Sequence, residues 1–178
     1  MSITTSGSVI TFPNSTTQAS GAKILQVVST FDNTQYTFSS GSYNQTTYYS
    51  ISGLTATITP LFSTSKILII ASCAVGQPGN SYNNFLRLYR GSTAIALGNP
   101  SGFAAAATGG YRSPDSSALG CIAMNFLDSP ATTGSTTYSV QICNSGGGSS
   151  YSYVNRPAQY TGWEQTGSST LTILEVGA

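Results

Sequence analysis

The chain has 178 residues, only 6% of them charged, and it contains no histidine. This absence excludes Ser-His-Asp and Cys-His catalytic arrangements as well as imidazole metal ligands. The six basic residues are scattered and give a net charge of +1, so the clustered basic surface that nucleic-acid binding requires is also excluded.

Residues 1–22 form a polar segment with one small apolar cluster, Val9, Ile10 and Phe12, followed by Pro13. A segment with so little apolar surface cannot fold alone. We expect an extended anchor or linker segment that becomes ordered on a partner. No apolar stretch approaches the ~20 residues of a membrane span, so membrane insertion is not expected.

From residue 23 the chain becomes a succession of short apolar and alternating stretches. Residues 34–38 alternate polar and aromatic side chains, as a half-buried strand does, and residues 66–75 are continuously apolar, as in a central strand buried on both faces. The predicted strands are 23–31, 34–38, 47–51, 54–59, 66–75, 85–90, 93–97, 119–127, 136–143 and 168–176. Residues 23–178 are therefore predicted to be one all-β antiparallel sandwich (jelly roll).

Two longer stretches without periodicity, residues 98–117 and 146–165, are predicted to be exposed loops. Tyrosine and tryptophan offer large contact areas at small entropy cost, and they stack on sugar faces or fill protein pockets. Covering core edges or subunit contacts is the structural alternative for each of them. The candidate surface-binding residues are Tyr111, Arg112, Tyr151, Tyr153, Arg156, Tyr160 and Trp163.

No catalytic, cofactor or metal site is indicated by the sequence. The five carboxylates show no spacing that suggests the converging pair of a glycosidase. Gly146, Gly147 and Gly148 lack the lysine and helix of a phosphate-binding loop, and the three cysteines are widely spaced. We therefore expect a protein that is not an enzyme and that uses no cofactor.

An ordered set of segments resembles a family of virion proteins of tailed bacteriophages. These segments are KILQVV (23–28), ISGLTATITP (51–60), SKILII (65–70), FLRLYRG (85–91), FLDSPAT (126–132), YVNR (153–156) and LTILEV (171–176). The segment SVITFPNSTTQ (8–18) is also similar to one common in phage fibre proteins. The sandwich itself looks like the trimeric jelly-roll heads of the complement and tumour-necrosis-factor type.

The resemblance implies a homotrimer that is made in the host cytoplasm and exposed on the particle surface. Its N-terminal segment, with Val9, Ile10, Phe12 and Pro13, would anchor it to other virion proteins. A scarcity of surface charge agrees with faces that are covered by other subunits.

Two functions remain open at this stage. The first is a tail-fibre or spike tip whose loops contact a host-surface glycan or protein. The second is a capsid decoration or head-fibre protein with a mainly structural role.

Overall fold

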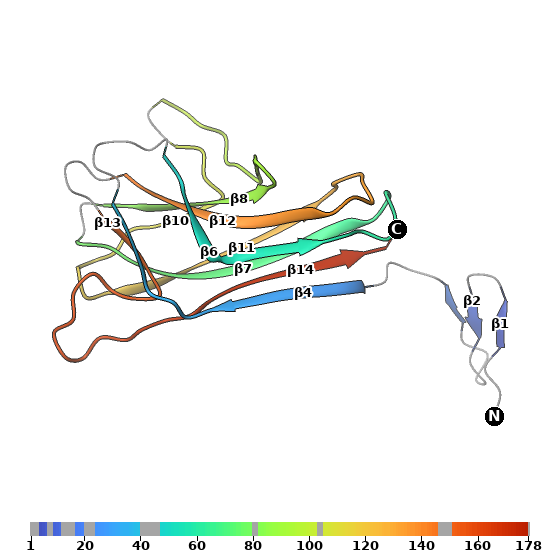
Figure 1. Ribbon diagram of the computed structural model, residues 1–178, viewed down its shortest axis with the longest axis horizontal. Helices are drawn as coiled ribbons and strands as arrows, with labels where there is room; N and C mark the ends of the chain where they lie inside the picture. The colour runs from blue at the N-terminus through green and yellow to red at the C-terminus, as the bar shows by residue number, and fades with distance from the viewer. Residues whose placement is uncertain are drawn as a thin grey trace.

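The computed structural model describes residues 4–6, 9–11, 17–19, 24–39, 47–79, 82–102, 105–145 and 151–177. Within these ranges the regular structure consists of β-strands alone. Two antiparallel sheets pack face to face (Figure 1). The prediction of an all-β antiparallel sandwich is therefore confirmed.

The larger sheet has six strands and is built around β7, which pairs with β14 and β13 on one side and with β11 on the other. Both edges of β7 are paired, but only its inward face is buried in the single chain, since Ile70 on the outer face is 43% exposed. The expectation that this strand is buried on both faces was therefore wrong for the single chain. The strands are β4 (Ile24–Asp32), β14 (Ser169–Val176), β7 (Lys66–Gly76), β13 (Tyr151–Val154), β5 (Tyr36–Ser39) and β11 (Leu119–Asp128).

The smaller sheet has five strands in the order β10-β8-β12-β6, with β9 also paired to β8. The strands are β6 (Tyr49–Ile58), β8 (Asn84–Arg90), β9 (Thr93–Ile95), β10 (Gly109–Tyr111) and β12 (Thr136–Asn144). Along the chain β6, β7, β8, β11, β12 and β14 alternate between the two sheets. This repeated crossing is the connectivity of a jelly roll.

The core lies between the sheets and follows the period-2 pattern of the strands. In β7 the inward side chains of Ile67, Ile69, Ala71 and Cys73 are almost fully buried. They meet inward residues of the smaller sheet, of which Tyr138 on β12 is the largest.

A small sheet lies beside the sandwich in the segment expected to be an extended anchor (Figure 1). It consists of β1 (Thr4–Ser6), β2 (Val9–Thr11) and β3 (Thr17–Ala19), all antiparallel. Val9 and Ile10 lie on β2, whereas Phe12 and Pro13 fall outside the described residues. The anchoring role of all four stays a prediction.

Two short strands lie where exposed loops were expected. β10 falls within the predicted loop 98–117, and β13 falls within the predicted loop 146–165. The first prediction failed because β10 is only a Gly-Gly-Tyr sequence, and the second because β13 is surrounded by loop-forming glycine and serine. Both strands are held by pairing to longer neighbours rather than by their own propensity.

The predicted strands 47–51 and 54–59 form one continuous strand, β6. Thr55 lies opposite Ser139, whereas Ser50 lies opposite Gln141, so β6 has extra residues at a bulge. Gly53 lies in this bulge, and a Cβ there would come within 2.2 Å of the Asp32 carboxyl. The glycine marks the close approach of the Asp32 side chain to the β6 backbone, not the end of a strand.

The outer faces of the two sheets differ in chemistry. On the larger sheet, Val27, Leu174, Leu68 and Leu127 lie side by side across four strands. Val27 is 55% exposed and Leu127 is 47% exposed. On the smaller sheet, the outward positions are largely hydroxyl-bearing, as where the Thr57 and Thr137 hydroxyls lie 2.8 Å apart. We call the outer face of the larger sheet, over β4, β14, β7 and β11, the apolar face.

Candidate functional site

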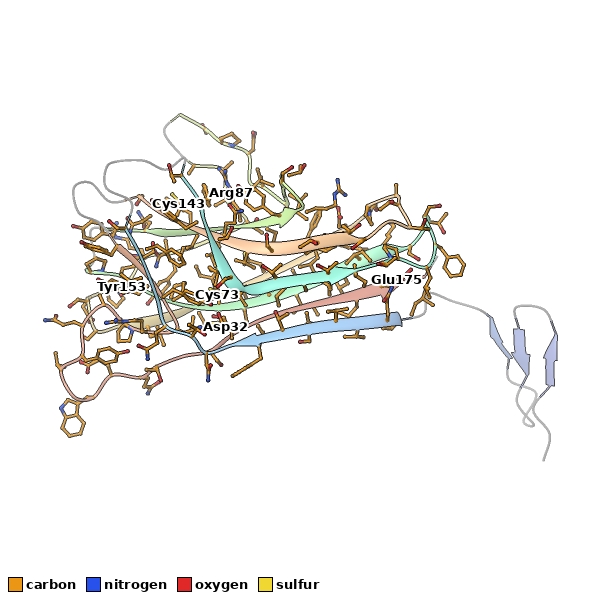
Figure 2. All side chains as sticks on the ribbon, viewed as in Figure 1. Asp32, Cys73, Arg87, Cys143, Tyr153 and Glu175 are labelled. Atoms are coloured by element: carbon orange, nitrogen blue, oxygen red, sulfur yellow. The ribbon has the colours of Figure 1, made fainter. Side chains whose placement is uncertain are left out.

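Several candidate surface residues gather at one end of the sandwich. Figure 2 shows Tyr153 near this end and Glu175 near the opposite end. Tyr153 lies on β13 opposite Gly76, the last residue of β7. Leu119, the first residue of β11, lies opposite the same glycine. We call this the far end and the end that holds Glu175 the base.

A cationic side chain lies between two of the predicted tyrosines. The guanidinium of Arg156 lies 5.1 Å from the ring centroid of Tyr153 and 5.1 Å from that of Tyr160. The Tyr160 hydroxyl contacts the Gln35 side-chain oxygen at 3.2 Å, and the Tyr151 and Tyr153 rings are 6.3 Å apart. Burial raises the pKa of the Tyr153 phenol above its usual value. The structure therefore brings four candidates, Tyr151, Tyr153, Arg156 and Tyr160, into one cation–π and aromatic cluster.

Trp163 stands apart from that cluster and is 94% exposed. It follows Gly162, whose φ of 115° is open to glycine and rare for other residues. The Glu164 carboxylate accepts hydrogen bonds from the backbone N–H groups of Thr161 at 2.6 Å, Gly162 at 2.8 Å and Trp163 at 3.1 Å, and also from the Thr161 hydroxyl. The turn that carries the indole is thus built around one carboxylate.

An open hollow of about 370 Å³ lies beside the indole, with Ser117, Ala118, Leu119, Trp163, Glu164 and Gln165 along its walls. The Asp115 carboxylate fixes the wall opposite Trp163 because it accepts from the Ser117 and Ala118 backbone N–H groups, both at 2.8 Å. These hydrogen bonds, led by that of the Ser117 hydroxyl, lower the pKa of Asp115.

The two regions predicted as separate contact loops meet here. The Gln159 backbone N–H donates to the Ser116 carbonyl at 3.0 Å, and the Ser116 hydroxyl donates to the Gln159 side chain at 2.9 Å. Two segments about forty residues apart therefore form one surface.

Tyr111 lies in a strand and not in the exposed loop that was predicted. Tyr111 belongs to β10 and packs at the edge of the core, where its ring lies so close to Gly120 that a Cβ there would approach it to 2.2 Å. Its expected place in an exposed loop was wrong, because pairing with β8 draws it inward. Arg112 follows the strand and is exposed.

Asn155 supports the far end from within, although the sequence indicated no role for it. It is fully buried, and its φ of 61° turns the chain from β13 into the loop. Its side-chain amide donates to the Asp32 and Thr34 carbonyls at 3.0 and 2.9 Å, and its side-chain oxygen accepts from the Ser169 hydroxyl at 2.6 Å. An asparagine directly after a strand is the only signal that could have pointed to this turn.

Glu164, Ser117 and Gln165 were also not among the predicted site residues. For Glu164 the signal was available, since a carboxylate just after Thr-Gly-Trp is placed to cap a tight turn. Ser117 and Gln165 carry no comparable signal, because only the folded chain brings them to one hollow.

The remaining carboxylates also hold the fold together. Asp32 accepts from the Thr34 backbone N–H at 2.9 Å. Glu175 accepts from the Gln26 amide at 2.6 Å and from the Leu61 backbone N–H at 2.8 Å, which ties the base together. Among the described residues, no three His, Cys, Asp or Glu side chains gather closely enough to hold a metal ion. No helix of these residues is long and apolar enough to cross a membrane.

Comparisons with known proteins find similarity at the level of structure. No protein-family model matches the chain, and no curated protein matches it. A chain in the structure of infectious bursal disease virus, Gx strain, matches with a TM-score of 0.46 and 14% sequence identity. The match covers 90% of the present chain and 42% of the viral chain, so the present chain spans less than half of that neighbour.

Proposed function

We propose that the chain is a structural component of a virus particle and forms a homotrimeric appendage on it. Its base and N-terminal segment are directed towards other virion proteins, and its far end is directed towards the host surface. It works by assembly and binding and does not catalyse a reaction. The segments that resemble tailed-phage virion proteins support the class of protein, and the apolar face supports the assembly.

The observation that carries the trimer is the contrast between the two outer surfaces. The apolar face exposes Phe31 by 67%, Val27 by 55% and Ile70 by 43%. Lys66 is its one charged residue among the outward positions of β4, β14, β7 and β11. The Ser29 and Thr172 hydroxyls, 2.8 Å apart, lie between Val27 and Phe31 and are a polar break in this face. Large apolar side chains exposed together on one face are nevertheless typical of a surface that a partner covers. Three copies packed about an axis through this face would cover it and leave the hydroxyl-bearing sheets outside.

Light scattering of the purified chain tests the assembly. We expect a particle of three times the 18.4 kDa chain mass at micromolar concentration. A monomer under these conditions would contradict the trimer and would leave the apolar face unexplained.

Cryo-electron microscopy of intact particles tests the location. Density at a tail or fibre tip agrees with the appendage proposed here. Density on capsid lattice positions would replace it with the capsid-decoration function.

Removal of residues 1–22 tests the anchor. The shortened chain should still fold and form trimers, because the apolar face belongs to the sandwich, but it should be missing from purified particles. Normal incorporation of the shortened chain would contradict the anchoring role of this segment.

A further inference from the structure

The exposed indole of Trp163 projects from a turn that is held by hydrogen bonds. Burial of an aromatic ring is favourable, so a ring left in water is less stable than a buried one. Here the ring is 94% exposed. Four hydrogen bonds to Glu164 fix the turn beneath it. Because the backbone of this turn is already ordered, little backbone entropy is lost when a ligand binds beside it.

The opposite wall of the hollow is fixed in the same manner. The Asp115 carboxylate accepts from the Ser117 hydroxyl at 2.8 Å and from two backbone N–H groups. The hollow is also lined by the apolar side chains of Ala118 and Leu119 and by the amide of Gln165. At about 370 Å³ the hollow falls within the range of roughly 300–1,000 Å³ found for small-molecule sites.

We propose that this hollow binds a neutral carbohydrate, with one face of a sugar ring stacked on Trp163 and its hydroxyls directed to Gln165 and Ser117. A pyranose has an apolar face of C–H groups and an edge of hydroxyls, which matches one aromatic surface beside amide and hydroxyl groups. The proposal deepens the host contact of the proposed function and rests on it.

The negative charge around the hollow favours neutral sugars over acidic ones. Asp115 and Glu164 both flank the hollow, and both are ionised at neutral pH because their hydrogen bonds lower the pKa of each. Two negative charges repel a sugar carboxylate or phosphate. The same ionisation leaves neither group able to donate a proton to a glycosidic oxygen, so the sugar is bound and not cleaved.

Trimer formation would strengthen a weak site of this kind. One open hollow offers a small contact area, but three linked copies engage a repetitive polysaccharide together. Linked sites raise apparent affinity by roughly 10²–10⁴ without any new contact, provided that the geometry allows simultaneous binding.

Trp163 is the single tryptophan of the chain, so the tryptophan fluorescence comes from the proposed site alone. We would titrate the full chain with oligosaccharides ending in glucose, galactose, mannose or N-acetylglucosamine, with sialyllactose as the acidic comparison. At least one neutral probe should shift the emission to shorter wavelength and protect it from acrylamide quenching, with saturation. No effect from any neutral probe, or an effect from sialyllactose alone, would overturn the proposal.

Variants separate the site from the rest of the surface. On an array of the same oligosaccharides, Trp163→Ala should reduce binding at least tenfold, whereas Trp163→Tyr should retain part of it. Phe62→Ala is the matched control, since Phe62 is another aromatic residue, 56% exposed, in the loop that joins β6 to β7 at the base. Equal binding by Trp163→Ala and the unmodified chain would refute the site.

Failure of the sugar site and failure of the assembly give different results. A monomeric chain would bind the array weakly and still show the saturable fluorescence change. A trimer found at a particle tip that gives no fluorescence change with neutral probes would agree with the proposed function. The same result would contradict the sugar site.

Discussion

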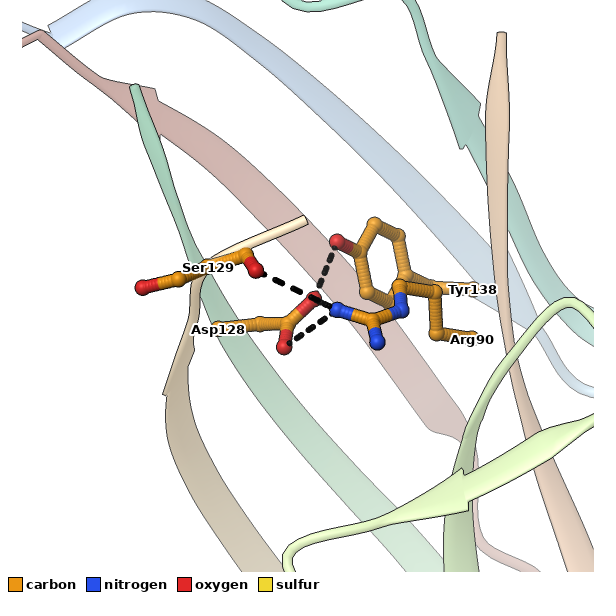
Figure 3. Close-up of polar contacts among 4 residues, drawn as sticks. All are labelled: Arg90, Asp128, Ser129 and Tyr138. Carbon is orange, nitrogen blue, oxygen red and sulfur yellow. Dashed lines mark hydrogen bonds and ion pairs between the residues drawn. The ribbon is translucent and has the colours of Figure 1, made fainter. Parts of the chain in front are cut away.

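The Arg90 guanidinium lies 3.0 Å from both carboxylate oxygens of Asp128, across the space between the two sheets (Figure 3). Arg90 ends β8 in the smaller sheet, and Asp128 ends β11 in the larger sheet. The Tyr138 hydroxyl donates to the same carboxylate at 2.7 Å, and Asp128 is only 6% exposed. Burial, with the hydrogen bond to Asp128, raises the pKa of Tyr138.

Removal of either charge should destabilise the sandwich. Asp128→Asn and Arg90→Met each leave a poorly solvated polar partner, and breaking a buried pair costs roughly 3–5 kcal/mol. The side chain of Arg90 is 33% exposed, so we expect the lower end of this range. Urea denaturation should show that the free energy of unfolding falls by about 3 kcal/mol. Thr55→Val, at an exposed position of the smaller sheet, is the control and should change the free energy of unfolding by less than about 0.5 kcal/mol. If Asp128→Asn lowered the free energy of unfolding by less than about 1 kcal/mol, the pair would contribute little to the stability of the sandwich.

The same pair shows which parts of the fold could be predicted from the sequence alone. Alternation and apolar runs predicted the long strands, since the period of 2 is a local property that survives in any sandwich. Arg90 and Asp128 lie at the ends of the predicted strands 85–90 and 119–127, but nothing in either segment indicates that the two side chains meet. That contact depends on the crossing of strands between the sheets, which is a property of the whole fold.

The far end shows the same limit. Trp163 and Tyr160 were predicted as exposed aromatic residues, and the structure leaves both exposed. The contribution of Ser117 and Gln165 was missed because residues 117 and 165 meet only through loops on different strands. Tyr111 was misplaced because the pairing that buries it supplies no local pattern.

Gly53→Ala should be strongly destabilising although alanine is otherwise tolerated in strands. The new methyl group would lie 2.2 Å from the Asp32 carboxyl carbon, so β4 and β6 would have to move apart. Overpacking of this kind costs roughly 1–3 kcal/mol, and we expect the upper part of that range in urea denaturation. Gly98→Ala is the matched control, because its nearest neighbour is a carbonyl oxygen at 3.5 Å. Equal effects of the two substitutions would contradict the close approach of Asp32 and Gly53.

Val27→Glu should break the trimer and spare the fold. Val27 is 55% exposed in the single chain, so a carboxylate there stays solvated in the monomer. In the assembly it would be placed without a partner in an apolar contact, at a cost of several kcal/mol. Light scattering should give the monomer mass, while the circular dichroism spectrum stays unchanged. Thr55→Glu, at an exposed position of the smaller sheet, should remain trimeric. If both variants were trimers, the interface would lie elsewhere.

The three thiols should differ sharply in reactivity. Burial raises the pKa of Cys73 to about 12 and that of Cys143 to about 11, whereas Cys121 is exposed on the apolar face. The thiolate is the reactive form, so a maleimide at pH 8 should modify only Cys121 in the native chain. Mass spectrometry should find one label per chain before unfolding and three after it. If the proposed trimer covers this face, labelling should be faster in Val27→Glu. An equal rate in both proteins would place Cys121 outside the interface.

The turn beneath Trp163 should resist acid until its carboxylate is protonated. The hydrogen bond from the Thr161 hydroxyl, followed by those from the backbone amides, holds the pKa of Glu164 at about 2, against an ordinary value of 4.5. A lowered folded-state pKa means that the stabilisation is complete above pH 4.5 and is lost as the pH falls through about 2.

Fluorescence anisotropy of the single tryptophan measures this loss as freer motion of the indole. The anisotropy should be constant from pH 7 to about 4.5 and should fall as the pH approaches about 2. It is read only where circular dichroism shows an intact sandwich. Glu164→Gln should give a lower value at pH 7 and no such transition, because its amide cannot titrate and offers one acceptor oxygen where the carboxylate offers two. Asp115→Asn is the control and should keep the transition. An acid transition that persists in Glu164→Gln would assign the change to another group.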